Sequence, residues 1–216
     1  MTMRANKWRV LTITSVIILA PILYGLSLYD ELPARMAIHF NINNQPDQWA
    51  AKPFVLFGLP ILLLALQWIC VLITAAKTKT QPPAPRLERV VYSIVPVISV
   101  VVYIVTIQFS LGAVTDIRRI ILLLIGLVFI ALGNYFPTVP VESQWYVSHP
   151  HPRINDRDLW RKMSRQLGYA FVVGGILMIV TLFFAPLVSA ICLVLVIGWI
   201  LGLSLYSWYK SRRISS

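Results

Sequence analysis

Long apolar intervals without a charged residue alternate with short polar segments along the chain. Four of these intervals cover residues 10–29, 53–76, 90–115 and 120–141. Each is long enough to cross the hydrocarbon core of a bilayer as a helix, which takes about 20 residues. The pattern therefore predicts a membrane-spanning helix in each of the four intervals.

A fifth apolar interval, residues 166–209, is about twice as long as one crossing requires. Ala185 and Pro186 interrupt it near its middle, and proline bends or ends a helix because it lacks a backbone donor. We interpret the interval as two helices joined by a tight turn. The predicted fold is all-α and polytopic, with six transmembrane helices in three helical hairpins.

The polar segments divide the chain into four regions. The first helical hairpin takes residues 1–76 and includes a large loop at about residues 30–52. The second takes residues 77–133 and begins with a stiff proline-rich linker. Residues 134–165 form the other long polar segment, and residues 166–216 form the third helical hairpin with a basic tail.

Lysine and arginine are distributed unequally between the two sides that six spans create. Fifteen of the 19 lie in the N-terminus, the second and fourth loops and the C-terminal tail. The remaining four are Arg35, Lys52, Arg118 and Arg119. Because positively charged flanking segments stay in the cytoplasm, we predict that both termini are cytoplasmic and that the loop at 30–52 faces outward.

Composition supports a membrane protein and identifies its simplest partner. The chain is 58% hydrophobic and 12% charged, with a mean hydropathy of +0.75, whereas about a quarter of a soluble domain is charged. A net charge of +11 fits basic residues that flank spans and contact anionic headgroups. We therefore expect membrane lipids as partners and no direct binding of nucleic acid, for which the chain has no domain.

Candidate chemistry gathers in the outward loop, where His39 lies near Asn41 and Asp47. One histidine and one carboxylate fall short of the three or four ligands that zinc needs, so we predict neither a metal nor another cofactor. We interpret His39 as a hydrogen-bonded structural residue. His149 and His151 also lack a third ligand, and we assign them to a surface loop.

No charged side chain falls inside a predicted span, whereas ion-coupled carriers usually place ionisable groups at membrane depth. Phosphate-binding glycine loops and zinc-protease motifs do not occur either. The sequence therefore predicts a protein without catalytic activity. Three alternatives stay open: a small-molecule transporter or exporter, a membrane enzyme that uses either the His39–Asp47 pair or the histidines at 149 and 151, and a scaffold for another membrane subunit.

The polar segment at 134–165 has two parts. Residues 134–152 are rich in proline and aromatic side chains, which argues against a regular helix. Asn155 or Asp156 can then cap a helix that continues into the fifth span. We interpret Trp160, near the start of that helix, as an aromatic anchor at the membrane interface.

The outward loop carries several uncommon residues at fixed offsets. They are Leu32-Pro33, Ile38-His39-Phe40-Asn41, Pro46-Asp47-x-Trp49 and Lys52. A second set lies in the C-terminal half and consists of Gly133-Asn134-Tyr135-Phe136-Pro137, Trp160-Arg161-Lys162, Arg165 and Gly168. Both sets resemble the SdpI family of bacterial membrane proteins, the first matching its N-terminal module. Asn44 or Gln45 stands where that family often has glycine.

The resemblance implies a multi-pass protein of the bacterial cytoplasmic (inner) membrane that protects a producing cell from a secreted killing peptide. It also implies that a transcriptional repressor is held at the membrane once the toxin is bound. The chain departs from the family at the cytoplasmic side, where residues 147–152 replace a Gly-Ile-Arg-Thr-Pro-Trp-Thr stretch. Met163 and Ser164 replace Thr-His before Arg165. The outward module is therefore better preserved than the inward one.

We therefore expect an immunity or signal-transduction protein whose outward loop contacts an amphipathic toxin peptide. Aromatic and arginine side chains dominate such interfaces, and Met36 is expected among the apolar contacts. The predicted peptide-binding residues are Arg35, His39, Phe40, Asn41, Pro46, Asp47 and Trp49. The predicted cytoplasmic signature consists of Asn134, Pro137, Trp160, Arg165 and Gly168.

Overall fold

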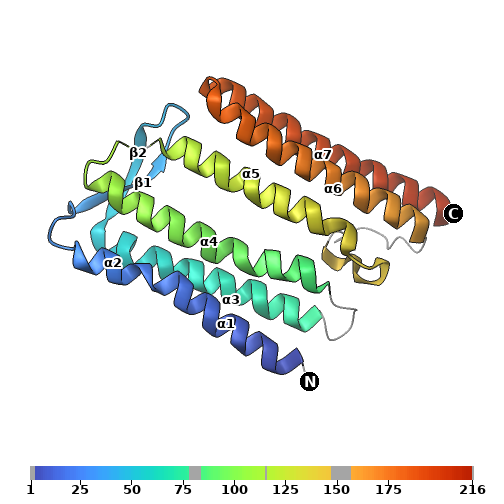
Figure 1. The fold of residues 1–216 in the computed structure, drawn as a ribbon, viewed down its shortest axis with the longest axis horizontal. Helices are drawn as coiled ribbons and strands as arrows, with labels where there is room; N and C mark the ends of the chain where they lie inside the picture. The colour runs from blue at the N-terminus through green and yellow to red at the C-terminus, as the bar shows by residue number, and fades with distance from the viewer. Residues whose placement is uncertain (1–2, 78–83, 115, 147–156, 216) are drawn as a thin grey trace. The chain divides into compact units, whose positions relative to one another are not determined.

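The computed structural model describes residues 3–77, 84–114, 116–146 and 157–215. Helices dominate this part of the chain (Figure 1). The α-helices are α1 (Met3–Leu19), α2 (Pro21–Ser27), α3 (Leu59–Lys77), α4 (Pro85–Ser110), α5 (Ile117–Tyr135), α6 (Arg157–Val180) and α7 (Pro186–Ser215). The shorter helical turns are η1 (Phe54–Gly58), which is π-helical, and the 3-10 turns η2 (Phe136–Thr138), η3 (Val141–Tyr146) and η4 (Thr181–Phe183).

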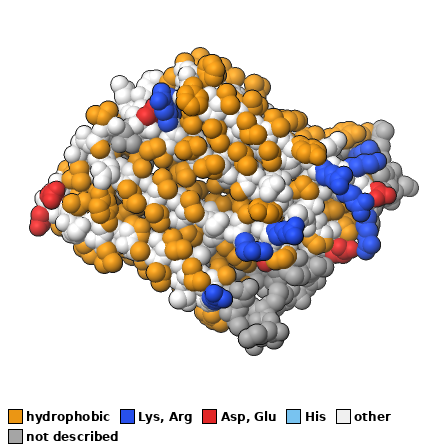
Figure 2. Space-filling view, in the orientation of Figure 1, with side chains coloured by type: hydrophobic (Ala, Val, Ile, Leu, Met, Phe, Trp, Pro, Cys, Tyr) orange, Lys and Arg blue, Asp and Glu red, His pale blue; other side chains and the backbone are white. Residues whose placement is uncertain are grey.

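Within the described residues, six helical stretches are long and apolar enough to cross a membrane, which confirms the number predicted from the charge-free intervals. They cover Lys7–Ser27, Phe54–Ala76, Pro85–Ser110, Ile117–Thr138, Arg157–Phe183 and Pro186–Tyr206. Apolar side chains accordingly cover most of the face seen in Figure 2. The predicted break in the last apolar interval is also confirmed, because η4 follows α6 and α7 begins at Pro186. The orientation of the termini stays a prediction.

The prediction of an all-α fold is wrong in one segment. The loop between the first two spans contains two strands, β1 (Arg35–Phe40) and β2 (Pro46–Ala51), which pair as an antiparallel β-hairpin. Pairing satisfies backbone donors and acceptors that a loop of this length would otherwise leave to water. The protein is therefore a helical membrane protein with a small β-hairpin at the end of its first helical pair.

Residues 1–77 and 91–120 form one compact unit. In this unit α1 lies along α3 (Figure 1), and the indole Nε1 of Trp68 donates a 3.0 Å hydrogen bond to Ser15 Oγ. A buried apolar cluster lies below the β-hairpin and joins it to the helices. Its members are Leu32, Met36, Val55, Leu56, Tyr103 and Ile107. The same packing that fixes the helices therefore also fixes the base of the β-hairpin.

A polar contact inside this unit compensates for a proline at membrane depth. Pro96 lies within α4 and has no N–H to donate to the carbonyl of Tyr92, four residues earlier. Gln67 of α3, which is fully buried, donates from Nε2 to that carbonyl at 2.9 Å. A side chain from a neighbouring helix thus supplies the donor that the proline removes, as membrane helices often require.

Residues 78–90 and 121–216 form a second compact unit. Its antiparallel helices α5 and α6 approach closely at two glycine pairs. A Cβ on Gly133 would lie 2.6 Å from the carbonyl oxygen of Gly168, and a Cβ on Gly126 would lie 2.9 Å from that of Gly175. Small residues allow membrane helices to pack at short range, where dispersion contacts hold them together. The glycine pairs therefore fix the register of α6 on α5.

The described stretch directly after α5 forms no regular α-helix, as its prolines and aromatics predicted. The 3-10 turns η2 and η3 carry it from Phe136 to Tyr146, with a kink at Ser143. The helix predicted to lead into the fifth span is α6. Its predicted caps Asn155 and Asp156, and the histidines at 149 and 151, lie outside the described residues.

Candidate functional site

The β-hairpin has an irregular register that brings its two polar candidates together. Ala37 pairs with Trp49 and His39 with Gln48, so Ile38 is an extra residue on β1. The register shifts again after His39. As a result the His39 Nδ1 and Asp47 Oδ1 atoms lie 2.5 Å apart, which confirms the hydrogen-bonded state predicted for His39.

The turn of the β-hairpin is built by asparagines. The side-chain oxygen of Asn41 accepts hydrogen bonds from the N–H groups of Asn43 and Gln45, at 2.9 and 3.1 Å. Asn44 adopts a left-handed conformation with φ of 61°, which asparagine tolerates better than other residues with a Cβ. Asn44 therefore fills a turn position that glycine would otherwise occupy.

Asn44 also binds the start of α5. Its Oδ1 accepts hydrogen bonds from the backbone N–H groups of Ile117 and Arg118, at 2.9 and 3.4 Å. Asp116 caps the same helix end, accepting from the N–H of Arg119 at 3.1 Å. The first amides of a helix have no partner within the helix, so a cap supplied by a distant turn ties the two segments together.

Two further contacts fix the β-hairpin to the helices. The ring of Phe40 packs edge-on against Phe109 of α4, with centroids 4.8 Å apart. The Lys52 ammonium donates to the carbonyls of Tyr29 and Leu32, at 2.9 and 3.0 Å, and lies 4.2 Å from the centre of the Tyr29 ring. A cation at carbonyls beyond the last turn of α2 is favourably placed. The β-hairpin is therefore anchored at its turn, its middle and its base.

The predicted peptide-binding residues accordingly fall into two groups. Phe40 and Asn41 hold the β-hairpin in shape, and Pro46 is half-buried opposite Phe40 at the strand end. Met36 is fully buried in the apolar cluster, so the expectation that it contacts a peptide is wrong. The second group is exposed and consists of Arg35, His39, Asp47 and Trp49, to which the structure adds Ile38 and Ile42. We call these six residues the hairpin surface.

The hairpin surface combines apolar and charged groups beyond the ends of the spans. Trp49 is 47% exposed and Ile42 is 58% exposed. Arg35 donates from Nη2 to the backbone carbonyl of Trp49 at 3.3 Å, which links the guanidinium to the neighbouring strand. In the described part of the chain no three His, Cys, Asp or Glu side chains are placed to hold a metal. The His39–Asp47 pair is open to solvent rather than enclosed in a cavity.

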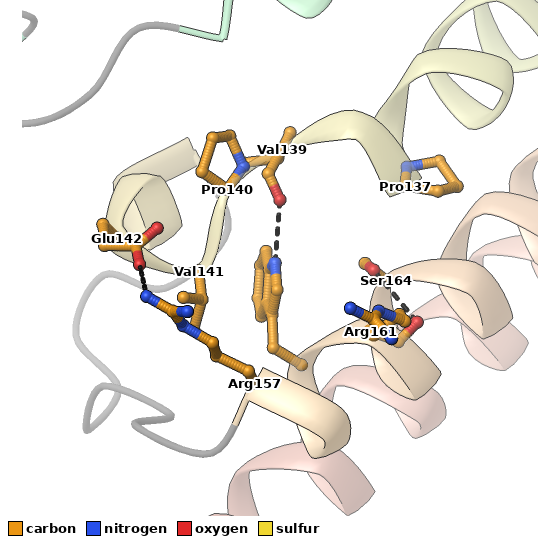
Figure 3. A pocket seen from close by; sticks show the side chains of 9 residues that line it. Pro137, Val139, Pro140, Val141, Glu142, Arg157, Arg161 and Ser164 are labelled. Carbon is orange, nitrogen blue, oxygen red and sulfur yellow. Dashed lines mark hydrogen bonds and ion pairs between the residues drawn. The ribbon is translucent and has the colours of Figure 1, made fainter.

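A pocket in the second unit lies between the end of α5 and the start of α6 (Figure 3). Its volume is about 390 Å³. It is lined by Pro137, Val139, Pro140, Val141, Glu142, Arg157, Trp160, Arg161 and Ser164. We call it the α5–α6 pocket. An ion pair between Arg157 Nη2 and Glu142 Oε1, 3.0 Å long, bridges η3 and α6 at its edge.

The predicted cytoplasmic signature is divided between packing and surface positions. A Cβ on Gly168 would lie 2.9 Å from Pro137 Cγ, so these two residues belong to the contact between α5 and α6. Trp160 is only 5% exposed and donates from Nε1 to the carbonyl of Val139 at 2.8 Å, so it is not an aromatic-belt anchor. Asn134 and Arg165 are exposed.

Sequence reasoning missed the contacts that make these sites. Asn44 was noted only as a departure from glycine, although asparagine in a turn is a recognised signal for a left-handed conformation. From the sequence, Arg157 counts only as a positive charge beside a span, Arg161 counts as such a charge and as part of the family resemblance, and no role is predicted for Glu142. No local pattern identifies them as lining residues, because they converge from segments separated along the chain.

The fold and the two sites define a multi-pass membrane protein with a structured β-hairpin between its first two spans. A family model described as a domain of unknown function, DUF1648, matches residues 16–64. The matched stretch contains the end of the first span, the whole β-hairpin and the start of α3. No curated protein and no solved structure matches the chain.

Proposed function

We propose that this chain is a bacterial immunity protein of the cytoplasmic membrane that binds a secreted amphipathic toxin peptide at the hairpin surface. The observation that carries the proposal is an anchored β-hairpin that leaves Trp49 and its apolar neighbours exposed beyond the membrane spans. Bound peptides gain affinity from a surface that is already ordered, because less conformational entropy is lost on binding.

The chemistry of the hairpin surface fits an amphipathic peptide. Tryptophan and arginine are the side chains that most often dominate the energy of an interface. Trp49, Ile38 and Ile42 offer apolar contacts, while Arg35 and the His39–Asp47 pair offer charged groups that orient a ligand. With six crossings and cytoplasmic termini, the β-hairpin would face the side on which a secreted peptide arrives.

Survival of a sensitive host tests the proposal. Cells that express the chain are challenged with a panel of secreted amphipathic killing peptides, and a double variant carries Trp49→Ala and Asp47→Ala. The matched control is Gln48→Ala, which changes an exposed residue between them on β2. We expect the wild type and Q48A to protect against at least one peptide and the double variant to lose protection.

Two outcomes would overturn the proposal: full protection by the double variant at normal membrane levels, or no protection by the wild type against any peptide. A photocrosslinking residue at position 42 gives an independent readout, because the exposed turn should capture the peptide that is neutralised. Substrate-dependent flux through proteoliposomes, unaffected by the double variant, would instead favour a small-molecule transporter.

The proposal extends to relay of the signal to a transcriptional repressor in the cytoplasm. The segment after the fourth span would face the cytoplasm, and its exposed polar candidates are Asn134 and Arg165. A fluorescent small helix-turn-helix repressor encoded beside the gene should move to the membrane when the toxin is added. The double variant N134A/R165A should leave it dispersed without lowering protection, whereas recruitment by this variant would contradict the relay.

A further inference from the structure

The α5–α6 pocket lies at the ends of two candidate membrane spans, where a membrane helix is expected to meet lipid headgroups. It is lined by residues at the end of the span Ile117–Thr138 and at the start of the span Arg157–Phe183. Helix ends of spans lie near the interface between hydrocarbon and water. Whatever fills this pocket is therefore drawn from the interface or from the solution beside it.

Some of the side-chain hydrogen-bond donors that line the pocket already have an acceptor in the protein. The indole N–H of Trp160 is used by the carbonyl of Val139, and the hydroxyl of Ser164 donates to the carbonyl of Arg161 at 3.2 Å. The guanidinium groups of Arg157 and Arg161 therefore supply the side-chain donors for a ligand. The positive end of the α6 dipole adds to their attraction for an anion.

The two arginines differ in their acidic neighbours. The carboxylate of Glu142 lies 3.0 Å from Arg157, whereas the carboxylate of Asp158 lies 4.0 Å from Arg161. Both pairs are solvent-exposed, and exposed ion pairs contribute little to stability. An incoming anion can therefore bind Arg161 directly and compete with Glu142 for Arg157.

We propose that the α5–α6 pocket binds the phosphodiester headgroup of an acidic phospholipid, with Arg161 as its main contact. The planar guanidinium suits the oxygens of a phosphate, to which it can donate two hydrogen bonds. The pocket volume of about 390 Å³ equals roughly a dozen waters at about 30 Å³ each, enough for a glycerol phosphate group. Its proline and valine walls suit the apolar part of the lipid next to the headgroup. This site is independent of the proposed function of the β-hairpin.

Purified full-length protein in neutral detergent tests the proposal by titration with matched lipids. Phosphatidylglycerol and phosphatidylcholine with identical acyl chains are compared, with binding followed by native mass spectrometry and by the thermal midpoint. Inorganic phosphate and glycerol phosphate serve as probes without acyl chains. We expect wild-type protein to bind phosphatidylglycerol at least tenfold more tightly than phosphatidylcholine and than either free phosphate probe.

Three variants give opposed predictions. Arg161→Gln should weaken phosphatidylglycerol binding about tenfold, while Glu142→Gln should strengthen it severalfold because it releases Arg157. Lys162→Gln removes an exposed charge at the same depth that does not line the pocket, and it should change binding less than twofold. The thermal midpoint without lipid reports whether each variant is folded.

Several results would overturn the proposal. Equal weakening by K162Q and R161Q would indicate diffuse attraction of charge rather than a site. Weaker binding by E142Q would contradict the competition for Arg157, and this test holds even if R161Q fails to fold. Equal affinity for free phosphate and phosphatidylglycerol would refute a lipid ligand. An acidic peptide added to the same titration that bound more tightly than phosphatidylglycerol and free phosphate would refute the lipid proposal and indicate a protein partner.

Discussion

Replacing Asn44 separates the two tasks that this side chain performs in the β-hairpin. Asn44→Gly removes the acceptor that caps α5 but keeps the left-handed conformation available, since glycine adopts positive φ without strain. Asn44→Ala removes the same acceptor and adds the cost of placing a Cβ at φ of 61°. The exposed neighbour Asn43 offers a matched control in the variant Asn43→Ala.

The magnitudes follow from the contacts. The bond to Ile117 N–H is 2.9 Å long and the contact to Arg118 N–H is 3.4 Å, so only the first has good geometry. Losing it should lower the free energy of unfolding by about 1 kcal/mol. For alanine, the left-handed conformation should lower the free energy of unfolding by about 1 kcal/mol more. We therefore expect a loss of about 1 kcal/mol for N44G and about 2 kcal/mol for N44A.

Two measurements test this reasoning. Reversible unfolding in mixed micelles gives the free energies, and hydrogen exchange reports the amide of Ile117. Both variants should expose that amide to exchange, whereas N43A should change neither measurement. Equal losses for N44G and N44A would refute the backbone argument. A protected Ile117 amide in N44G would refute the cap.

Other substitutions test the helix contacts. Gly168→Ala should lower the free energy of unfolding by about 1–3 kcal/mol, because its Cβ would lie 2.8 Å from a backbone carbonyl; Gly202→Ala, in open space, should be neutral or stabilising. Trp160→Phe should lower the free energy of unfolding by about 1–3 kcal/mol, since the buried carbonyl of Val139 loses its donor. An unchanged midpoint of chemical unfolding would contradict this. Gln67→Leu should lower the free energy of unfolding by about 1 kcal/mol alone but by less in a Pro96→Ala background, which restores the helical N–H. If the two changes in free energy were strictly additive in this double-mutant cycle, the two residues would act separately.

The spans were predictable because the bilayer imposes a simple requirement on each segment. A charge-free apolar stretch of the right length is readable from local sequence, and so is the break at Pro186. The β-hairpin was not predicted, since its short strands are stabilised by contacts far along the chain. The bond from Asn44 to Ile117 and the packing of Phe40 on Phe109 are examples.

The candidate site was predictable in outline and not in detail. Sequence reasoning selected the loop that forms the β-hairpin and the residues His39 and Asp47, which the structure brings into contact. It could not separate exposed Trp49 from buried Met36, because both belong to strands whose register contains a bulge. Trp160 was assigned to the membrane interface for a similar reason, since its acceptor lies 21 residues away in sequence.

The contact between Gln67 and the carbonyl near Pro96 has a consequence for biogenesis. A backbone carbonyl without its helical donor is costly in hydrocarbon, so α4 alone is a poor segment to release into lipid. The helix that supplies the donor, α3, is synthesised before it. We therefore expect the translocon to retain α3 until α4 has been synthesised, so that the second and third spans enter the bilayer together.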